Sequence, residues 1–348
     1  MPDPRPLPPR AGALATLTTT LALAFGFALA QSDVVNVYTA RHYATDEALY
    51  ERFEAETGIE VRIIEGDSDE LIARMQSEGD AGPADVFLTV DAGRLWRAEQ
   101  AGLLQPIDSD VVEAAVPDAF LHPDGLWFGL TQRVRGLVTS VDRVEPGAIT
   151  TYEELADPAW ADRVCIRSSS NIYNQSLVAS LIESVGAEAA EAWAAGVNAN
   201  MARPPQGGDT DQIRAVAAGE CDVAVVNHYY LSRLIASGDA GDQEVADAVR
   251  FVYPNQDGRG AHVNVSGGGL VATAPNPENG RALLEFLVSE PAQEAFASSN
   301  NEFPILDGAA ASDAAAGLGD FTSDAVNVVS YGENNPEAVR IFDRVGWR

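Results

Sequence analysis

The sequence predicts an α/β fold with a mostly parallel sheet and helices on both of its faces. Short runs rich in β-branched residues alternate with helical patterns four or five times in the first hundred residues after position 30. The chain has 348 residues, which is enough for one large or two medium domains. A hydrophobic content of 46% and an aromatic content of 7% are typical of a folded globular protein.

Three strand and helix pairs open this pattern. The run "VVNVYTA" at 34–40 predicts a strand, and "TDEALYERFEAETG" after it predicts a capped helix that ends at Gly58. The stretches "IEVRIIEG" and "SDELIARMQSEG" predict the second pair. "ADVFLTV" and "DAGRLWRAEQAG" predict the third. Strands that are separated by helices in this way are expected to run parallel.

A second α/β region follows "LWFGLTQRVRGLVTS" at 126–140, in which two apolar runs flank Arg133 and Arg135. Strands are expected in "RVCIR" and "CDVAVVN", with a helix from about Asn174 between them. "GAHVNVSGGGLVAT" at 260–273 predicts a return to strand, and "ENGRALLEFLVSEPAQEAFA" predicts one long amphipathic helix. The stretch at 307–320, rich in Ala, Gly and Asp, has little pattern of its own.

The first thirty residues predict a signal peptide rather than part of the fold. Arg5 and Arg10 precede an uncharged apolar stretch that ends in Ala28-Leu29-Ala30, and cleavage is expected after Ala30. A retained membrane anchor is the alternative. Export favours a disulfide between Cys165 and Cys221, the only two cysteines, over two buried free thiols.

Composition and motifs exclude several classes of function. The chain carries 52 acidic and 22 basic residues, all of the latter arginine, and its net charge of −30 argues against a nucleic-acid partner. Solubility in a salty medium or a codon bias explains such a charge without a specific role. The sequence contains no GxxxxGK[ST], GxSxG or HExxH motif, and its four histidines are far apart. We therefore do not expect an enzyme.

Four of the nine tyrosines lie where a strand-like run passes into a loop or helix: Tyr43, Tyr173, Tyr229 and Tyr230. A single such tyrosine is usually a half-buried aromatic with a hydrogen-bonded hydroxyl. Ligands of open α/β sheets gather at the carboxyl ends of strands, so four phenols in these positions are expected to converge. "VVNHYYLSRL" at 225–234 ends a strand with two adjacent tyrosines, whose side chains reach one place only if the backbone turns there.

Several phenols in one place indicate a hard, highly charged cation. A phenol has a pKa of about 10 and becomes an anionic donor at neutral pH only when a charge such as a bound metal lowers that pKa. Fe³⁺ is the natural match for phenolate oxygen. Arginines beside the site would offset the excess negative charge, and Arg41, Arg133 and Arg233 are candidates by position. Arg233 lies four residues after Tyr229, on the same face if a helix begins there.

The chain resembles the periplasmic ferric-ion-binding proteins of bacterial ABC iron importers, in particular the FutA-like branch. The resemblance runs through nearly all residues after position 30, and its specificity comes from the combination of "RHY", "NIYNQS" and "NHYY". It implies a two-lobe periplasmic solute-binding protein of type II, with the ligand cleft between the lobes. The implied N-lobe comprises residues 31–131 and about 256–306, and the C-lobe residues 132–255 and about 307–348.

The resemblance also implies the iron ligands and their surroundings. By motif, the metal ligands are Tyr43, Tyr173, Tyr229 and Tyr230. His42 matches a position that some relatives use as a ligand and others do not, so its role stays open. Arg133 and Arg233 match arginines near the iron. His228 matches a less fixed position and is interpreted as structural. Four tyrosines imply that no synergistic anion is needed.

The expected function is therefore capture of Fe³⁺ in the periplasm by a monomeric protein, which delivers the ion to an inner-membrane ABC permease. Closure of two lobes over the metal is the expected mechanism. The same fold could instead bind an oxyanion or a polyamine. "RSSSN" at 167–171 is the one feature that favours an oxyanion.

Overall fold

The computed structural model describes Met1, residues 33–41 and residues 46–348. Asp33–Arg348 forms one compact unit. The predicted signal peptide, His42 and Tyr43 lie outside the described residues. Within the described residues, no helix has both the length and the apolar character that crossing a membrane requires.

The strands of the described chain join in one ten-stranded sheet with the order β2-β1-β3-β9-β5-β7-β6. In addition, β4 pairs with β9, while β8 and β10 pair with β5. The strands are β1 (Val34–Thr39), β2 (Glu60–Glu65), β3 (Val86–Val90), β4 (Leu104–Gln105), β5 (Phe128–Ser140), β6 (Val164–Cys165), β7 (Val223–Asn227), β8 (Val249–Val252), β9 (Val263–Val271) and β10 (Phe303–Pro304).

The sheet has mixed strand directions, so the prediction of a mostly parallel sheet is wrong at its centre. β1 runs parallel to β2 and β3, and β6 runs parallel to β7. The long strands β5 and β9 run antiparallel to each other and to their other neighbours. The two apolar runs around Arg133 and Arg135 form one strand of 13 residues. Its first half pairs with β9 and its second half with β7 and β8.

Fourteen α-helices surround this sheet in the part of the chain that is described, with four short 3-10 turns between them. The helices are α1 (Asp46–Thr57), α2 (Ser68–Glu78), α3 (Ala92–Gln100), α4 (Asp110–Ala115), α5 (Ile172–Val185), α6 (Ala187–Ala199), α7 (Asp209–Ala218), α8 (His228–Ala236), α9 (Ala240–Asp247), α10 (Pro277–Leu287), α11 (Glu290–Asn300), α12 (Asp313–Ala316), α13 (Val329–Glu333) and α14 (Asn335–Val345).

The long helix predicted from "ENGRALLEFLVSEPAQEAFA" is two helices, α10 and α11. The chain breaks because Ser289 has an extended conformation (φ −68°, ψ 152°) and Pro291 occupies the first turn of α11. Proline lacks an N–H group and fits the first turn of a helix but not its interior. The amphipathic pattern continues across the break, which explains why the sequence pattern did not reveal it.

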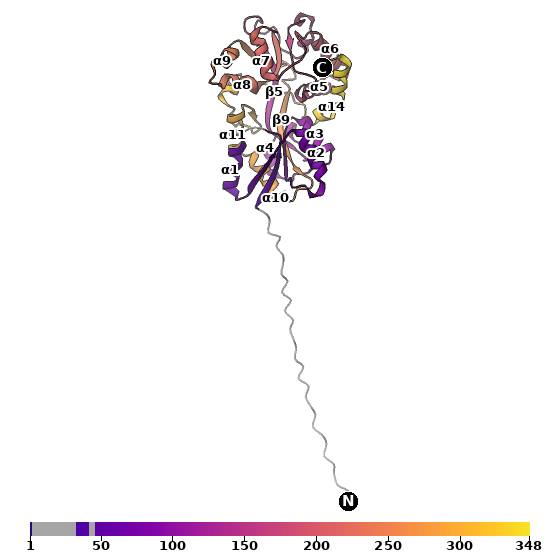
Figure 1. The fold of residues 1–348 in the computed structure, drawn as a ribbon, viewed down its shortest axis with the longest axis vertical. Coiled ribbons are helices and arrows are strands. Elements are labelled where there is room, and N and C mark those ends of the chain that lie inside the picture. The colour runs from indigo at the N-terminus through magenta and orange to yellow at the C-terminus, as the bar shows by residue number, and fades with distance from the viewer. Residues whose placement is uncertain (2–32, 42–45) are drawn as a thin grey trace. The chain divides into compact units, whose positions relative to one another are not determined.

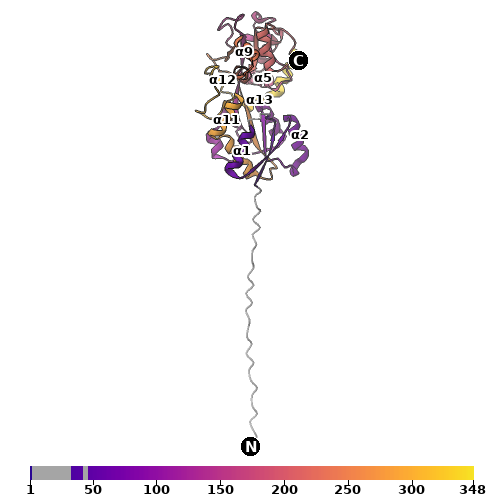
Figure 2. The same ribbon diagram turned by 60° about the vertical axis from the view of Figure 1, so that its left-hand side comes forward.

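Helices cover both faces of the first strands, as the sequence predicts. α1 and α2 lie on opposite sides of the β1–β3 part of the sheet (Figure 2). The last helix, α14, packs beside α5 and α6, which lie far from it in sequence (Figure 1). Trp347 after α14 contacts Trp193 of α6, with ring centroids 6.2 Å apart. The carboxyl-terminal segment therefore supports the helix that carries Tyr173.

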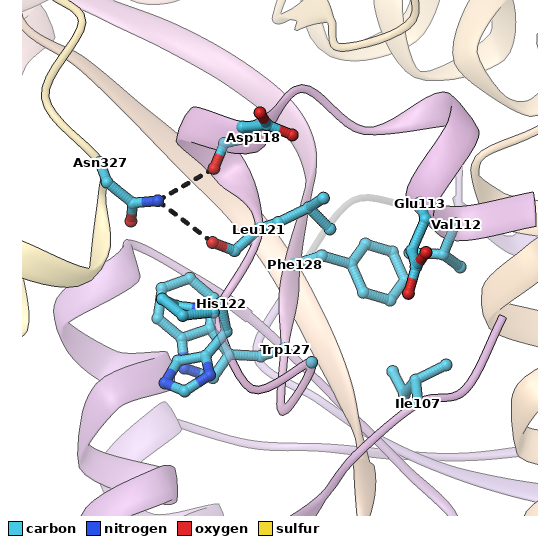
Figure 3. A pocket seen from close by; sticks show the side chains of 11 residues that line it. Ile107, Val112, Glu113, Asp118, Leu121, His122, Trp127, Phe128 and Asn327 are labelled. Atoms are coloured by element: carbon cyan, nitrogen blue, oxygen red, sulfur yellow. Dashed lines mark hydrogen bonds between the residues drawn. The ribbon is translucent and has the colours of Figure 1, made fainter. Parts of the chain in front are cut away.

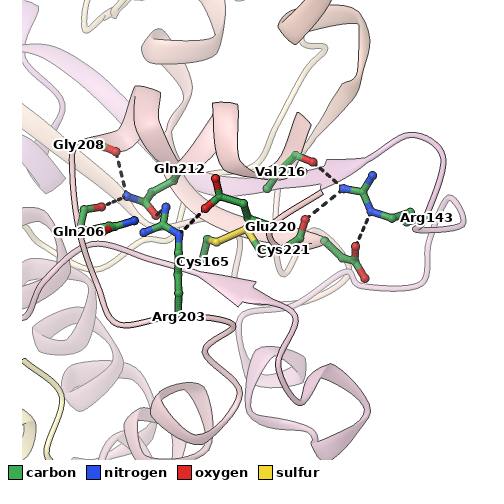
Figure 4. The surroundings of a disulfide bond; sticks show 10 residues. Arg143, Cys165, Arg203, Gln206, Gly208, Gln212, Val216, Glu220 and Cys221 are labelled. Atoms are coloured by element: carbon green, nitrogen blue, oxygen red, sulfur yellow. Dashed lines mark hydrogen bonds and ion pairs between the residues drawn. A yellow bond between two sulfur atoms is a disulfide. The ribbon is translucent and has the colours of Figure 1, made fainter. Parts of the chain in front are cut away.

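The predicted disulfide between Cys165 and Cys221 is present, which confirms the prediction (Figure 4). Both cysteines are buried. Cys165 ends β6, which leads towards α5, while Cys221 precedes β7, which leads into α8. Arg203 forms an ion pair with Glu220 at 3.0 Å beside the disulfide. The disulfide thus ties together the two segments that lead to the predicted tyrosines of α5 and α8.

Candidate metal centre

The adjacent residues Tyr229 and Tyr230 lie just beyond the end of a strand. β7 ends at Asn227 and α8 begins at His228, so both tyrosines lie in the first turn of a helix. Their ring centroids are 4.3 Å apart, with an angle of 34° between the planes. Tyr229 is buried and Tyr230 half-buried. The turn from strand to helix brings both phenols to one side of the backbone.

Tyr173 comes to the same place from a different element. It lies in the first turn of α5, whose N-cap residue Asn171 accepts a hydrogen bond from the backbone N–H of Tyr173 at 3.2 Å. The hydroxyl of Tyr229 donates to the hydroxyl of Tyr173 at 3.5 Å. The side-chain amide of Asn227 also donates to the Tyr229 hydroxyl, at 3.4 Å. Three of the four predicted tyrosines therefore lie together.

Arginine side chains surround these three phenols. The Cζ atoms of Arg133, Arg135 and Arg167 lie 5.4, 5.9 and 5.6 Å from the centre of the Tyr173 ring. Arg233 follows on α8, as the four-residue spacing predicts, and its Cζ lies 4.8 Å from the centre of the Tyr229 ring. Guanidinium groups at these distances attract the faces of aromatic rings and lower the cost of negative charge nearby.

Two buried carboxylates that the sequence patterns did not reveal lie behind these arginines. Glu302 approaches Arg133 at 3.4 Å, while Asp209 pairs with Arg135 at 3.1 Å. Glu302 and Asp209 are both fully buried. Their local sequences, "NEFPI" and "GGDTD", carry no sign of these partners, because the contacts join residues far apart in the chain.

Arg41 lies in the Glu302 part of this network. Its guanidinium pairs with Asp46 at 2.9 Å and with Glu302 at 3.6 Å. It also lies over the ring of Phe296, with its Cζ 4.8 Å from the ring centre. Arg41 immediately precedes His42 and Tyr43, two of the predicted ligands. Because Glu302 pairs with both Arg41 and Arg133, it links the residue before these predicted ligands to Arg133.

Burial, with smaller contributions from Tyr173 and from the charge of Asp209, raises the pKa of Tyr230 to about 12. The Tyr230 phenol therefore holds its proton at neutral pH, and a metal that binds it must displace that proton. Burial lowers the pKa of Arg133, but nearby negative charge, that of Glu302 foremost, outweighs this effect and leaves the pKa above its usual value. Arg133 is charged at every accessible pH.

His228 fits the structural role predicted for it. It is fully buried, and its Nδ1 accepts a hydrogen bond from the backbone N–H of Val134 at 3.2 Å. Its ring stacks on Phe303 with centroids 4.3 Å apart. Burial lowers the pKa of His228 to about 4, so the ring is neutral at physiological pH. It joins α8 to the centre of β5.

Residues 33–41 and 46–348 contain no cluster of three or more His, Cys, Asp and Glu side chains that is suited to a metal. A cavity of about 420 Å³ lies apart from the tyrosines, beside α4 and the start of β5. His122, Trp127 and Phe128 are among the residues that line it (Figure 3). On its rim, the Asn327 side chain donates to the carbonyl oxygens of Asp118 and Leu121 at 2.9 and 3.2 Å.

Comparison with known proteins places this chain in one family. Residues 48–323 match the family of bacterial extracellular solute-binding proteins. Iron uptake protein A1 of Synechocystis is 50% identical over 90% of this chain and 87% of its own length. The structure of Trichodesmium FutA (IdiA) in complex with iron and citrate matches with a TM-score of 0.89 and 50% identity, over 90% of this chain and all of that one.

A more distant structure, the ferric binding protein from Campylobacter jejuni, matches with a TM-score of 0.85 and 37% identity, over 90% of this chain and all of that one. These matches confirm the two-lobe, type II solute-binding fold that the resemblance implied. They also confirm the FutA-like branch. The chain therefore belongs to the bacterial extracellular solute-binding proteins, in the branch of the iron uptake proteins.

Proposed function

We propose that this protein captures Fe³⁺ with a cluster of tyrosines and delivers it to an ABC permease of the inner membrane. The proposed ligands are Tyr43, Tyr173, Tyr229 and Tyr230, and His42 is a further candidate. The observation that carries the proposal is the 3.5 Å contact between the hydroxyls of Tyr229 and Tyr173, with Tyr230 packed beside them. The names of the relatives, an iron uptake protein and a ferric binding protein, point to the same cargo.

The charges around the tyrosines fit a trivalent cation held by phenolates. Four phenolates carry one negative charge more than Fe³⁺ neutralises, so the bound site needs nearby positive charge. Arg133, Arg135, Arg167 and Arg233 lie around the described phenols, and Glu302 and Asp209 balance part of that charge. A polyamine would meet several guanidinium groups here, which makes a polycation a poor ligand.

We further propose the two lobes with residues 31–131 and about 256–306 in one, and residues 132–255 and about 307–348 in the other. β5 supports a boundary near residue 132, because it changes partners from β9 to β7 and β8 along its length. Tyr43 would then face Tyr173, Tyr229 and Tyr230 from the opposite lobe. Metal contacts from both sides would stabilise the closed form.

The proposed protein is periplasmic after cleavage behind Ala30, monomeric and not catalytic. Its relatives are named as iron uptake and iron-binding proteins, which supports a transport role. The disulfide between Cys165 and Cys221 fits an oxidising compartment.

The test is iron retention by the protein that begins at Gln31. It is loaded with ferric citrate, desalted and assayed for bound iron and for a phenolate-to-iron absorption band in the visible range. We expect about one iron per chain, and loss of both signals in the double variant Tyr229→Phe with Tyr230→Phe. Tyr253→Phe is the matched control, because the ring of Tyr253 packs on the rings of Phe251 and Phe321.

Two outcomes would contradict the proposal. A wild-type protein that retains no iron after desalting would remove the ferric function. Retention that survives in the Tyr229 and Tyr230 double variant would move the metal to other residues. In the first case an oxyanion, favoured by Ser168, Ser169 and Ser170 in the loop that leads into α5, becomes the next ligand to screen.

A further inference from the structure

Asp91 has an unusual backbone conformation in a fully buried place. It joins the end of β3 to the start of α3 with φ 81° and ψ 125°. Residues other than glycine rarely adopt such angles, because the side chain then crowds its own backbone. Such a conformation persists only where surrounding contacts hold it, and in buried loops it often marks a residue with a role in function.

The contacts that hold Asp91 join three elements of the fold. Its Oδ1 accepts hydrogen bonds from the backbone N–H of Gly93 at 2.9 Å and from the Ser176 hydroxyl at 2.6 Å. Its Oδ2 accepts from the side-chain amide of Asn264, in β9, at 3.0 Å. The backbone N–H of Asp91 donates to Val265 at 2.9 Å. One carboxylate therefore caps α3 and binds both β9 and α5.

Ser176 is the partner that connects this carboxylate to the metal centre. It lies on α5 three residues after Tyr173, which is about one helical turn and places both side chains on neighbouring parts of the helix surface. The Ser176 side chain is fully buried. Its hydrogen bond to Asp91 is short and is made to an anionic acceptor, the kind that contributes most.

The helices α3 and α5 approach closely at this point. A Cβ atom on Gly93 would lie 3.2 Å from Asp91 Oδ1, 3.4 Å from Ile172 Cδ1 and 3.6 Å from Ser176 Oγ. Glycine at this position thus lets α5 come close to the start of α3. One turn further along α3, Arg97 donates to Gln175 at 3.5 Å.

We infer that the hydrogen bond from Ser176 to Asp91 is a latch that holds α5, and with it Tyr173, against the opposite lobe. Ser176 and Asp91 are positioning residues: neither is a proposed iron ligand. This inference rests on the proposed function and on the proposed lobes, which put α3 and α5 on opposite sides. Opening the lobes breaks this bond and exposes the metal, so the latch slows iron release.

The test compares Ser176→Ala with wild type and with Ser180→Ala. Ser180 is the matched control, because it is buried on the same helix one turn later and donates only to the backbone carbonyl of Leu177, at 2.8 Å. Iron release is followed by loss of the visible band after addition of excess EDTA. Loss of one hydrogen bond to a charged group is expected to speed release about tenfold in Ser176→Ala, with Ser180→Ala unchanged.

A second measurement uses the metal-free proteins. Hydrogen exchange at the start of α3, where Gly93 donates to Asp91, should become faster in Ser176→Ala and stay at the wild-type rate in Ser180→Ala. This comparison tests the latch even if the wild type retains no iron, an outcome that removes the proposed function instead.

The inference is overturned if Ser176→Ala releases iron and exchanges hydrogen at the wild-type rates. It is also overturned if both serine variants release iron faster by the same factor, or if faster release in Ser176→Ala comes with a matching fall in the melting temperature of the metal-free protein. Either result would give Ser176 a role in the stability of α5 alone.

Discussion

Arg133 and Arg135 lie two residues apart on β5, and both guanidinium groups lie near Tyr173, yet they belong to different charge networks. Arg133 meets Glu302, which also binds Arg41 and accepts from the hydroxyl of Thr131 at 2.6 Å. These partners are all buried and lie outside α5 and α8.

Arg135 meets Asp209, and two of its other contacts go to residues close to the tyrosines in sequence. It donates to Asn227 at 2.9 Å and to Asn174 at 2.7 Å. Asn174 follows Tyr173, and Asn227 lies two residues before Tyr229. Asp209 also pairs with Arg167, whose side chain is 22% exposed. The Arg133 network is therefore the more buried of the two, and we expect it to contribute more to the stability of the fold. We expect the Arg135 network to contribute more to the geometry of the phenols.

The largest expected effect is that of Glu302→Gln on stability. The variant leaves Arg41 and Arg133 buried with less negative charge to balance them, and removal of one partner from a buried ion pair costs about 3–5 kcal/mol. Urea denaturation of the metal-free protein measures this loss. Glu56→Gln, which removes the carboxylate of the exposed pair with Arg52, serves as the control and should cost under about 1 kcal/mol. An equal loss in the free energy of unfolding for Glu302→Gln and Glu56→Gln would contradict the greater importance of the buried pair.

Removal of the disulfide should have the next largest effect, on the Arg135 side. Cys165→Ser together with Cys221→Ser is expected to lower the free energy of unfolding by about 2–4 kcal/mol, because the bond restricts the unfolded chain. The loop it closes spans 56 residues and contains Tyr173. The same denaturation experiment measures the loss, and dithiothreitol on the wild type should reproduce it. No change in either experiment would show that the disulfide does not support this region.

Asp209→Asn should cost less stability than Glu302→Gln but weaken iron binding more. Water reaches Arg167, and the asparagine oxygen can still accept a hydrogen bond from the backbone N–H of Asn227, which lies 2.8 Å from Oδ2 of Asp209 in the wild type. The expected loss in the free energy of unfolding is therefore about 1–3 kcal/mol. Outer partners of metal ligands typically contribute 10–100-fold to affinity, so a loss of about tenfold is expected. Competition with citrate for Fe³⁺ measures it. The comparison of the two networks fails if Glu302→Gln weakens iron binding more than Asp209→Asn.

The smallest effect concerns pH. Burial alone would raise the pKa of Glu302, but the charges of Arg41 and Arg133 outweigh it and leave the pKa below its ordinary value of 4.5. A carboxyl with a lower pKa in the folded state stabilises the fold above its unfolded pKa, and this contribution disappears as the pH falls through the folded pKa. The stabilities of wild type and Glu302→Gln should therefore converge below pH 4.5. Curves that stay parallel to pH 3 would contradict this assignment.

Local patterns predicted most of the elements, because strands and capped helices are marked by nearby residues. The first three strand and helix pairs, the start of α8 at the end of β7 and the disulfide are where the sequence placed them. The directions of β5 and β9 could not be read in this way, since strand pairing depends on distant segments. The break at Ser289 and Pro291 was hidden by an apolar pattern that continues through it.

The arginine and carboxylate networks were beyond the reach of sequence patterns for the same reason. Glu302 lies 169 residues from Arg133, and Asp209 lies 74 residues from Arg135. Asp91 is the first residue of the stretch "DAGRLWRAEQAG", which was predicted as a helix, and nothing in that stretch set it apart. Tyrosines at the ends of strand-like runs were visible because they follow a rule of the fold, and three of the four lie together in the described structure.

The central claim is that Tyr173, Tyr229 and Tyr230 bind the iron directly. Crystals of the iron-loaded protein, measured at the iron absorption edge, would locate the metal by its anomalous scattering. We predict one strong peak in contact with the hydroxyl oxygens of these three tyrosines and of Tyr43. A peak elsewhere, or none in crystals of protein shown to contain iron, would contradict the account.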